Sequence, residues 1–283
     1  MGLLDAARAA LQGQRALREL TAWARWRRPR VLVTIDGPSF TLRLSRALRP
    51  LPSVHVVAPQ VWAWRPGRVD RMAGATDVVL CLLPFEPAWF EGRLRAVFVG
   101  HPATDLVPDP QGPRPAVALL PGSRPSEVRR LAPVLRAVAD RLRTNTPKLD
   151  LITVRAPSTP ALDVPGLCTV DRVEQLAGVR GAVAASGTVT LQLAALGIPQ
   201  VVLARTDPLS WALGPSVVRT PWVALPNILA GQPVVAEHVQ HLDPDAIVRD
   251  LGHAGPAPLP DLGGRHAYGR MAEEVLARVV VAP

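Results

Sequence analysis

Cysteine is scarce in this chain of 283 residues, which contains only Cys81 and Cys168. Each lies inside or beside an apolar run, so we expect two buried small side chains in a reduced, cytoplasmic protein, and neither a disulfide nor a metal site. The one Asp-x-Asp string, Asp243-Pro244-Asp245, predicts a helix start with proline in its first turn rather than a metal site.

Long hydrophobic runs are missing as well. No window holds the roughly eighteen uninterrupted apolar residues that a membrane-spanning helix needs. The first residues, with Asp5 and no cleavage-site pattern, do not predict a signal peptide. No repeat occurs at solenoid spacing, which argues against a repeat architecture. With 48% hydrophobic residues, the chain is able to bury a large core, and its length suits two domains.

Lysine is nearly absent, since Lys148 is the only one, and the net charge of +9 therefore comes from arginine. A bias toward arginine reflects genomic base composition as easily as function. The positive surplus still suits an anionic partner such as a nucleotide, a phospholipid surface or a nucleic acid.

The stretch at residues 116–130 combines a predicted buried strand, a tight turn and an amphipathic helix. Gly122 allows the backbone to approach a ligand closely, and Ser123 is a favourable helix N-cap. Arg124 lies beside the free N–H groups of the first helical turn, where a phosphate is favoured. An ordinary strand-to-helix corner with a surface arginine has the same pattern, so both interpretations stay open here.

Polar residues follow other predicted strands too. Asp36 comes directly after the strand at 31–35, where α/β folds place ligands; its alternative role is to cap the next helix. A turn with Ser186, Gly187 and Thr188 follows the strand at 182–185, and its hydroxyls and amides suit a pyrophosphate or a ribose. Two further predicted strands, at 97–99 and 222–225, are followed by His101 and Asn227.

Two segments are rich in tryptophan. The loop after the strand at 54–58 contains Gln60, Trp62, Trp64 and Arg65, a string that structural packing explains only in part. The other segment is a predicted helix at residues 3–26, with tryptophans near its end and a basic group behind it. That helix either lies on an anionic membrane or packs its apolar side on a sheet, which is more common in α/β proteins.

Short strands alternate with helices along the whole chain, which is typical of parallel sheets. Residues 103–114 are rich in proline, aspartate and glycine, the composition of a linker. We therefore predict an α/β fold with two parallel sheets that face a cleft, and a closing helix at 264–281.

Seven strings together resemble the lipid-A-disaccharide synthases, a family of inverting glycosyltransferases with the GT-B architecture. They are IDGPSF (35–40), APQVWAWRPGRV (58–69), LPFEP (83–87), VGHP (99–102), LLPGSR (119–124), ASGTVTLQ (185–192) and LPNILAG (225–231), in the family's order. The resemblance implies that UDP-2,3-diacylglucosamine donates its sugar to the primary hydroxyl of 2,3-diacylglucosamine 1-phosphate, releasing UDP. It further implies a UDP-sugar donor with no cofactor, a lipid-phosphate acceptor and no nucleic-acid partner. A peripheral position on the cytoplasmic face of an anionic cell membrane and a homodimer fit the same family.

The resemblance also implies a set of site residues. Asp36 is the candidate base for the incoming hydroxyl, while Arg124 and the helix amides stabilise the departing diphosphate without a metal. The residues implied around UDP are Gly122, Ser123, Arg124, Ser186, Gly187, Thr188, Gln192 and Asn227. The residues implied on the acceptor or lipid side are Gln60, Trp62, Trp64, Arg65, Glu86 and His101.

The chain departs from the family pattern in three places. Family members begin with a strand-helix portion carrying Gly-Glu-x-Ser-Gly-Asp, so the acceptor-side Rossmann-like domain, at 1–104, is predicted to be incomplete. The UDP-sugar-binding domain is expected at 105–263, and the closing helix at 264–283. Ser39 replaces a second aspartate, and Gln192 replaces a glutamate, keeping a carbonyl acceptor for ribose but losing the charge.

These departures leave several functional hypotheses. One is a lipid glycosyltransferase, and another is a catalytically impaired relative that binds a nucleotide or anionic lipid. A third is a GT-B enzyme that uses a different sugar nucleotide or acceptor.

Overall fold

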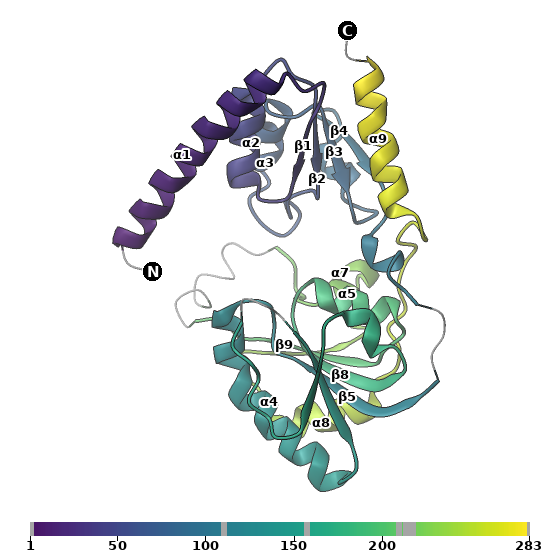
Figure 1. Cartoon of the computed structure of the whole chain (residues 1–283). Helices are drawn as coiled ribbons and strands as arrows, with labels where there is room; N and C mark the ends of the chain where they lie inside the picture. The colour runs from purple at the N-terminus through teal and green to yellow at the C-terminus, as the bar shows by residue number, and fades with distance from the viewer. Residues whose placement is uncertain (1–2, 109–111, 156–158, 208–210, 212–218, 282–283) are drawn as a thin grey trace. The chain divides into compact units, whose positions relative to one another are not determined.

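The computed structural model describes residues 3–108, 112–155, 159–207, 211 and 219–281 (Figure 1). The chain divides into two compact units, each with its own parallel sheet. Unit 1 consists of Met1–Asp105 and Asp261–Pro283, and unit 2 of Leu106–Pro260. The C-terminal helix thus belongs to the same unit as the N-terminal strands.

Unit 1 is built on a four-stranded parallel sheet in the order β1-β2-β3-β4. The strands are β1 (Leu32–Ile35), β2 (Ser53–Val56), β3 (Val78–Cys81) and β4 (Arg95–Phe98). The helices are α1 (Leu3–Arg27), α2 (Pro38–Ala47), α3 (Arg68–Ala73) and α9 (Ala267–Val281), with short 3-10 helices η1 (Pro87–Phe90) and η2 (Pro102–Thr104). Because the strands are parallel, the segments that follow them start at one edge of the sheet, where α/β folds bind ligands.

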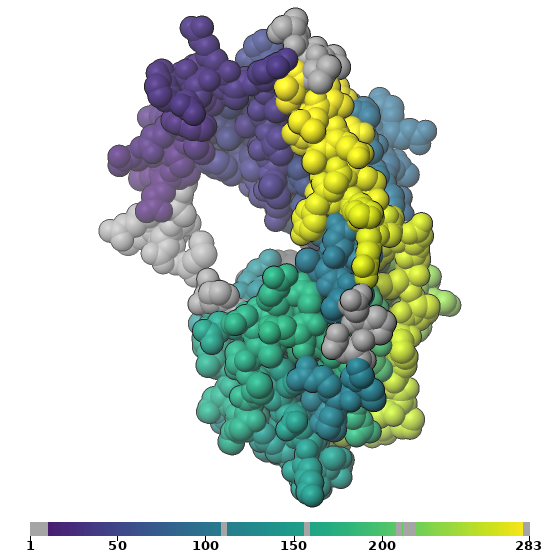
Figure 2. All heavy atoms as spheres, turned by 45° about the vertical axis from the view of Figure 1, so that its right-hand side comes forward, coloured from purple at the N-terminus to yellow at the C-terminus, as the bar shows by residue number. Residues whose placement is uncertain are grey.

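The inner strands β2 and β3 of the unit 1 sheet are covered on both faces, as is typical of parallel sheets, whereas Val33 and Ile35 of β1 are exposed. On one face, Val54 and Leu80 pack with Met271 and Val275 of α9, which explains why the closing helix joins this unit. Figure 2 shows α9, in yellow, along the purple and blue residues of unit 1. On the other face, Val79 and its neighbours pack against Val69 and Met72 of α3.

Helix α1 is covered only in part. Ala24, with Leu17 beside it, packs against Leu44 of α2 and Leu48 just beyond that helix. Leu11, Leu20 and both tryptophans of α1, Trp23 and Trp26, are exposed. Among the described residues, no helix combines the length and apolar content that crossing a bilayer requires.

Unit 2 contains a six-stranded parallel sheet in the order β10-β9-β8-β5-β6-β7. The strands are β5 (Arg114–Leu120), β6 (Asp150–Val154), β7 (Leu167–Val170), β8 (Val179–Ala185), β9 (Gln200–Ala204) and β10 (Ala236–Val239). The helices are α4 (Pro125–Asn145), α5 (Thr188–Ala195), α7 (Leu225–Ala230) and α8 (Pro244–His253), with the 3-10 helix η3 (Val173–Leu176). The first turn of α8 confirms the predicted helix start, since the Asp243 carboxylate accepts the Asp245 N–H at 3.0 Å.

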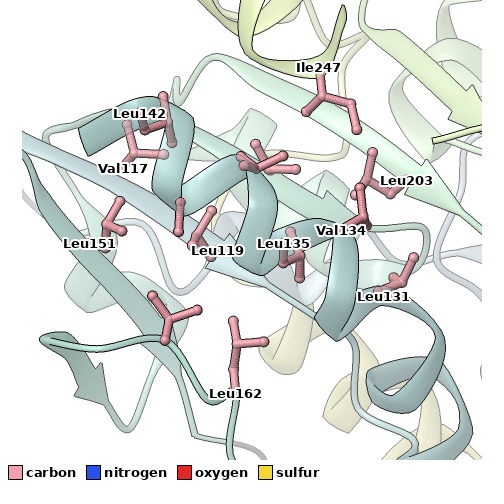
Figure 3. Packing of buried hydrophobic residues seen from close by; sticks show 14 of the residues in the cluster. Val117, Leu119, Leu131, Val134, Leu135, Leu142, Leu151, Leu162, Leu203 and Ile247 are labelled. Carbon is pink, nitrogen blue, oxygen red and sulfur yellow. The ribbon is translucent and has the colours of Figure 1, made fainter. Parts of the chain in front are cut away.

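Alternate residues of β5 face the two halves of the unit 2 core. Val117 and Leu119 belong to a buried cluster with side chains of α4 and with Ile247 of α8, as Figure 3 shows. Ala118 and Leu120 face the other side, toward Leu193 of α5. A strand buried on both faces explains the uninterrupted apolar run from residue 116 to 120.

Two sequence-based predictions are wrong. Residues 222–225 do not form a strand; α7 begins at Leu225, and the next strand of the sheet is β10. Cys168 is exposed, whereas Cys81 is fully buried as expected. The reason for the second of these differences is that β7 is an edge strand with both of its central residues exposed, so an apolar neighbour does not bury Cys168.

Candidate nucleotide and acceptor sites

A pocket of about 360 Å³ lies in unit 2, where the turns after β5 and β8 approach each other. Because β5 and β8 are neighbours in the sheet, their carboxyl ends bring these two turns together. Of the eight residues implied around UDP, the pocket is lined by Gly122, Ser123, Arg124, Ser186, Gly187, Thr188 and Gln192. Two segments more than sixty residues apart in the sequence thus form one polar site.

Position 122 requires a glycine, because of both its backbone conformation and the neighbouring side chains. Its φ is +101°, a conformation that residues with a side chain rarely adopt. A Cβ at this position would lie 2.6 Å from Oε2 of Glu127 and 3.3 Å from the Cβ of Ala185. The absence of a side chain therefore keeps the floor of the pocket open and allows α4 to approach β8.

Arg124, rather than Ser123, is the N-cap of α4, and the predicted Ser123 cap is wrong. The helix starts at Pro125, and the Glu127 carboxylate performs the capping role. It accepts the Arg124 backbone N–H at 3.3 Å and the Arg124 Nη1 at 2.8 Å. The Arg124 side chain remains 76% exposed, so its guanidinium is held at the pocket but stays accessible to a ligand.

Asn227 is the one residue of the predicted UDP set that lines neither described pocket. It is 1% exposed, and its amide is used entirely within the protein. Oδ1 accepts the N–H groups of Val234 and Val235, while Nδ2 donates to the Val235 carbonyl and to Glu237. These bonds, 2.7 to 3.0 Å long, tie α7 to the segment that enters β10.

Sequence reasoning missed Glu237, which supports the same corner. Its carboxylate accepts the N–H groups of Val223 and Ala224, and the Val223 carbonyl accepts a 2.6 Å hydrogen bond from Ser186 Oγ. Glu237 thus connects β10 to the turn that carries Ser186. No sequence signal distinguishes this glutamate from an ordinary surface residue.

A second pocket of about 720 Å³ adjoins the first and shares Arg124, Glu127 and Ser186 with it. Its lining also includes Arg205 and Gln240, which follow β9 and β10. The sequence contains a signal for both residues, because each is a polar residue directly after a strand. For Gln240 that signal could not be used, because β10 itself was not predicted.

Asp36 follows β1 at the carboxyl edge of the unit 1 sheet. Its φ is +50°, and its N–H donates to the Val56 carbonyl at 2.9 Å, which fixes the residue against β2. Within the described part of the chain, the exposed Asp36 carboxylate has no hydrogen-bond partner, and Gly37 rather than Asp36 is the N-cap of α2. The helix-capping alternative is therefore not what the structure shows.

The other acceptor-side residues fall into two groups. Gln60, Trp64 and Arg65 reach the surface, at least in part. Trp62, Glu86 and His101 are buried, with exposed fractions of 8%, 4% and 6%. The His101 Nδ1 accepts the Ala103 N–H at 3.0 Å, and burial lowers the pKa of His101 to about 4, so this histidine is a neutral structural cap.

Trp62 and Glu86 form an internal pair that holds the tryptophan loop to the turn after β3. Trp62 Nε1 donates to Glu86 Oε1 at 3.2 Å, and its ring meets Phe85 edge-on with centroids 5.4 Å apart. The Glu86 Oε2 accepts the N–H groups of Leu82 and Leu83, each at 3.0 Å. The pair therefore positions the loop from within the protein.

Burial raises the pKa of Glu86 from its ordinary value of 4.5 to about 7. The folded state thus binds this proton more tightly than the unfolded state, and Glu86 should make unit 1 less stable as the pH rises from about 4.5 to about 7. The expected loss is about 3 kcal/mol over that range. Urea unfolding of the Glu86→Gln variant should show a flatter pH dependence than the wild type.

The matched control is Glu91→Gln, which changes an exposed carboxylate in the same unit. It should leave the pH dependence of stability as it is in the wild type. Equal slopes for the wild type and Glu86→Gln would show that Glu86 ionises normally in the folded protein.

Comparison with known proteins identifies the family. A sequence model described as lipid-A-disaccharide synthetase matches residues 1–247. The chain belongs to this family. Family membership confirms the resemblance and makes the chain a glycosyltransferase of the hexosyltransferase type in lipid A biosynthesis.

Individual relatives agree with this assignment. The lipid-A-disaccharide synthase of Granulibacter bethesdensis is 37% identical over 267 residues, covering 85% of this chain and 68% of its own length. That of Gluconobacter oxydans is 37% identical over 266 residues, covering 85% of this chain and 64% of its own length. The chain therefore spans about two thirds of the length of these two relatives.

Solved structures share the fold. The UDP complex of Staphylococcus aureus MnaA is 13% identical, with a TM-score of 0.56 over 97% of this chain and 83% of that one. A UDP-GlcNAc 2-epimerase from Methanocaldococcus jannaschii, solved with UDP-GlcNAc and UDP, is 10% identical, with a TM-score of 0.61 over 94% and 80% of the two chains. These likenesses, with the two parallel sheets, confirm the predicted GT-B-like α/β fold class.

Proposed function

We propose that this chain transfers 2,3-diacylglucosamine from UDP to the primary hydroxyl of 2,3-diacylglucosamine 1-phosphate, with the UDP held by unit 2. The main support for the proposal is the pocket formed by the turns after β5 and β8, which is lined by Gly122, Arg124 and Ser186 to Thr188. The neighbouring pocket offers further volume for a nucleoside diphosphate sugar.

The pocket suits a departing diphosphate. The first N–H groups of α5 have no partner within the helix, and Gly187 and Thr188 stand at its start. Arg124 adds a guanidinium that binds two phosphate oxygens at once. As the bond from the anomeric carbon to the diphosphate breaks, its electron pair moves to the phosphate oxygen, and these groups stabilise that negative charge. Gln192, one turn further along α5, is the group for a ribose hydroxyl.

Asp36 is the proposed base in unit 1. Its carboxylate is exposed and has no hydrogen-bond partner among the described residues, so it is able to accept the proton of the acceptor hydroxyl. The hydroxyl oxygen then forms the new bond to the anomeric carbon. Direct displacement of this kind inverts the configuration at that carbon.

Incubation of the purified chain with the UDP-sugar donor and the lipid acceptor tests the proposal. We expect equal amounts of disaccharide 1-phosphate and UDP to form. Binding of UDP in calorimetry without turnover would overturn the transferase proposal in favour of the impaired, nucleotide-binding relative. The feature that favours this second candidate is Gln192, which replaces the family's glutamate and offers ribose a carbonyl acceptor without the negative charge.

We also propose that α1 rests on the anionic inner face of the cell membrane. The exposed fractions of Leu20, Trp23 and Trp26 are 41%, 58% and 73%. The Arg27 guanidinium lies 6.0 Å from the Trp23 ring and 5.5 Å from the Trp26 ring. Exposed tryptophans beside arginines are the composition of a helix at a lipid interface.

Vesicle co-sedimentation checks this membrane proposal. Trp26→Ala should lower binding to phosphatidylglycerol vesicles about tenfold, since it removes a large apolar side chain from the interface. The control is Trp89→Ala, which alters a tryptophan of η1 that is 39% exposed. Wild-type binding should also weaken in high salt. Vesicle binding that depends on neither the salt concentration nor the anionic lipid would exclude an electrostatic contact between α1 and the membrane.

A further inference from the structure

Three arginines recur at three-residue spacing where the tryptophan loop runs into α3. They are Arg65, Arg68 and Arg71. The guanidinium carbons of Arg65 and Arg68 lie 4.8 Å and 4.5 Å from the centroid of the half-buried Trp64 ring. Contact with the aromatic ring restricts both guanidinium groups and places them together at the surface.

Among the residues that the structure describes, no acidic side chain pairs with this cluster. Within the described ranges, none of the three arginines forms an ion pair, and Asp70, the acidic residue of α3, pairs with Arg93 instead. Burial, followed by the charges of Arg65 and Arg71, lowers the pKa of Arg68. Arg68 and Arg71 both lie on α3, where like charges at this spacing destabilise the helix. A bound anion would relieve this repulsion.

The cluster lies at the edge of the sheet that carries the candidate base. The tryptophan loop follows β2, and Asp36 follows the neighbouring parallel strand β1, with its N–H bonded to Val56 at the end of β2. Trp62 and Glu86 anchor the loop to the turn after β3. Arg65, with a φ of +54°, has the strained backbone that often accompanies a functional loop.

We propose that Arg65 and Arg68, supported by Trp64, form the subsite that binds the phosphomonoester of the lipid acceptor. Two guanidinium groups donate to the phosphate oxygens and thereby orient the acceptor with its hydroxyl toward Asp36. The proposal rests on the transferase function argued above, because that function supplies an acceptor with a phosphate. Arg71 adds to the positive field without a direct contact.

Steady-state kinetics of the full chain test the subsite with two acceptors, 2,3-diacylglucosamine 1-phosphate and the same lipid without its phosphate. The wild type should prefer the phosphorylated acceptor by about tenfold or more in kcat/KM. Arg65→Gln and Arg68→Gln should each reduce that preference toward one, mainly through the KM for the phosphorylated acceptor. The KM for the UDP-sugar should not change.

The matched control is Arg43→Gln on α2, which removes the same charge from an exposed position of the same unit. Its acceptor preference should equal that of the wild type. Circular dichroism and UDP calorimetry establish for each variant that the fold and the donor site are intact. Arg68→Lys, which keeps the charge, should retain part of the preference.

Several outcomes would overturn the subsite. One is an unchanged preference in both glutamine variants, and another is an equal loss in Arg43→Gln. A third is loss of phosphatidylglycerol vesicle binding with the acceptor preference intact, which would make the cluster a membrane contact instead. Failure of the transferase function itself is distinguishable, because the wild type would then turn over neither acceptor. In that event, the affinities for the two lipids replace turnover as the measure of preference. They are obtained from the change in Trp64 fluorescence on lipid binding, in the wild type and in each arginine variant.

Discussion

Replacement of Asp36 by asparagine should lower turnover by roughly a hundredfold or more and leave the affinity for UDP unchanged. The amide of asparagine has nearly the shape of the carboxylate but cannot accept a proton from the attacking hydroxyl. The backbone of Asp36 bonds to Val56, and its carbonyl accepts the Thr41 hydroxyl at 2.9 Å, so the substitution leaves the local fold in place.

The measurement compares kcat for disaccharide formation with the Kd of UDP from calorimetry. Asp150→Asn is the control, since it makes the same change at an exposed aspartate that begins β6 in unit 2. A loss of kcat confined to Asp36→Asn supports the base. Wild-type turnover in Asp36→Asn would require another group to accept the proton.

Arg124→Ala should weaken UDP binding by about 1.5–3 kcal/mol, the range for hydrogen bonds to charged groups. The substitution removes the guanidinium that both pockets share. It also leaves the Glu127 carboxylate without its 2.8 Å partner and next to the diphosphate. Loss of an attraction and gain of a repulsion act in the same direction, so we expect an effect in the upper half of the range.

Calorimetry with UDP measures this change, and Arg129→Ala serves as the control because Arg129 is an exposed arginine of the same helix. Glu127→Gln separates the two contributions, because it removes the repulsion and retains Arg124. An affinity in Arg124→Ala equal to that of the control would remove Arg124 from the nucleotide site.

The strand-to-helix corners were predictable because each is encoded by adjacent residues. The apolar run of β5, the glycine of the turn and the helical spacing of α4 all lie within one short stretch. The same holds for the turn between β8 and α5. Since parallel strands place such turns at one edge of the sheet, the pocket residues could be inferred before their contacts were known.

The roles of Asn227, Trp62 and Glu86 could not be inferred in this way. A conspicuous polar or aromatic residue after a strand predicts a ligand contact, yet the partners that satisfy these three side chains come from other segments. Asn227 bonds to the approach to β10, and Trp62 bonds to Glu86 across twenty-four positions. A buried side chain whose hydrogen bonds are already made within the protein has little left to offer a ligand.

The alternation of strands and helices, the family and the positions of the polar turns follow from local spacing and motif strings in the sequence. Which polar groups remain accessible depends on the folded structure. It placed Arg124 at the start of α4, joined α9 to unit 1 and left one face of α1 uncovered. The physical reason is that hydrogen bonding and burial depend on neighbours that are distant in the sequence, and only the folded chain brings those neighbours together.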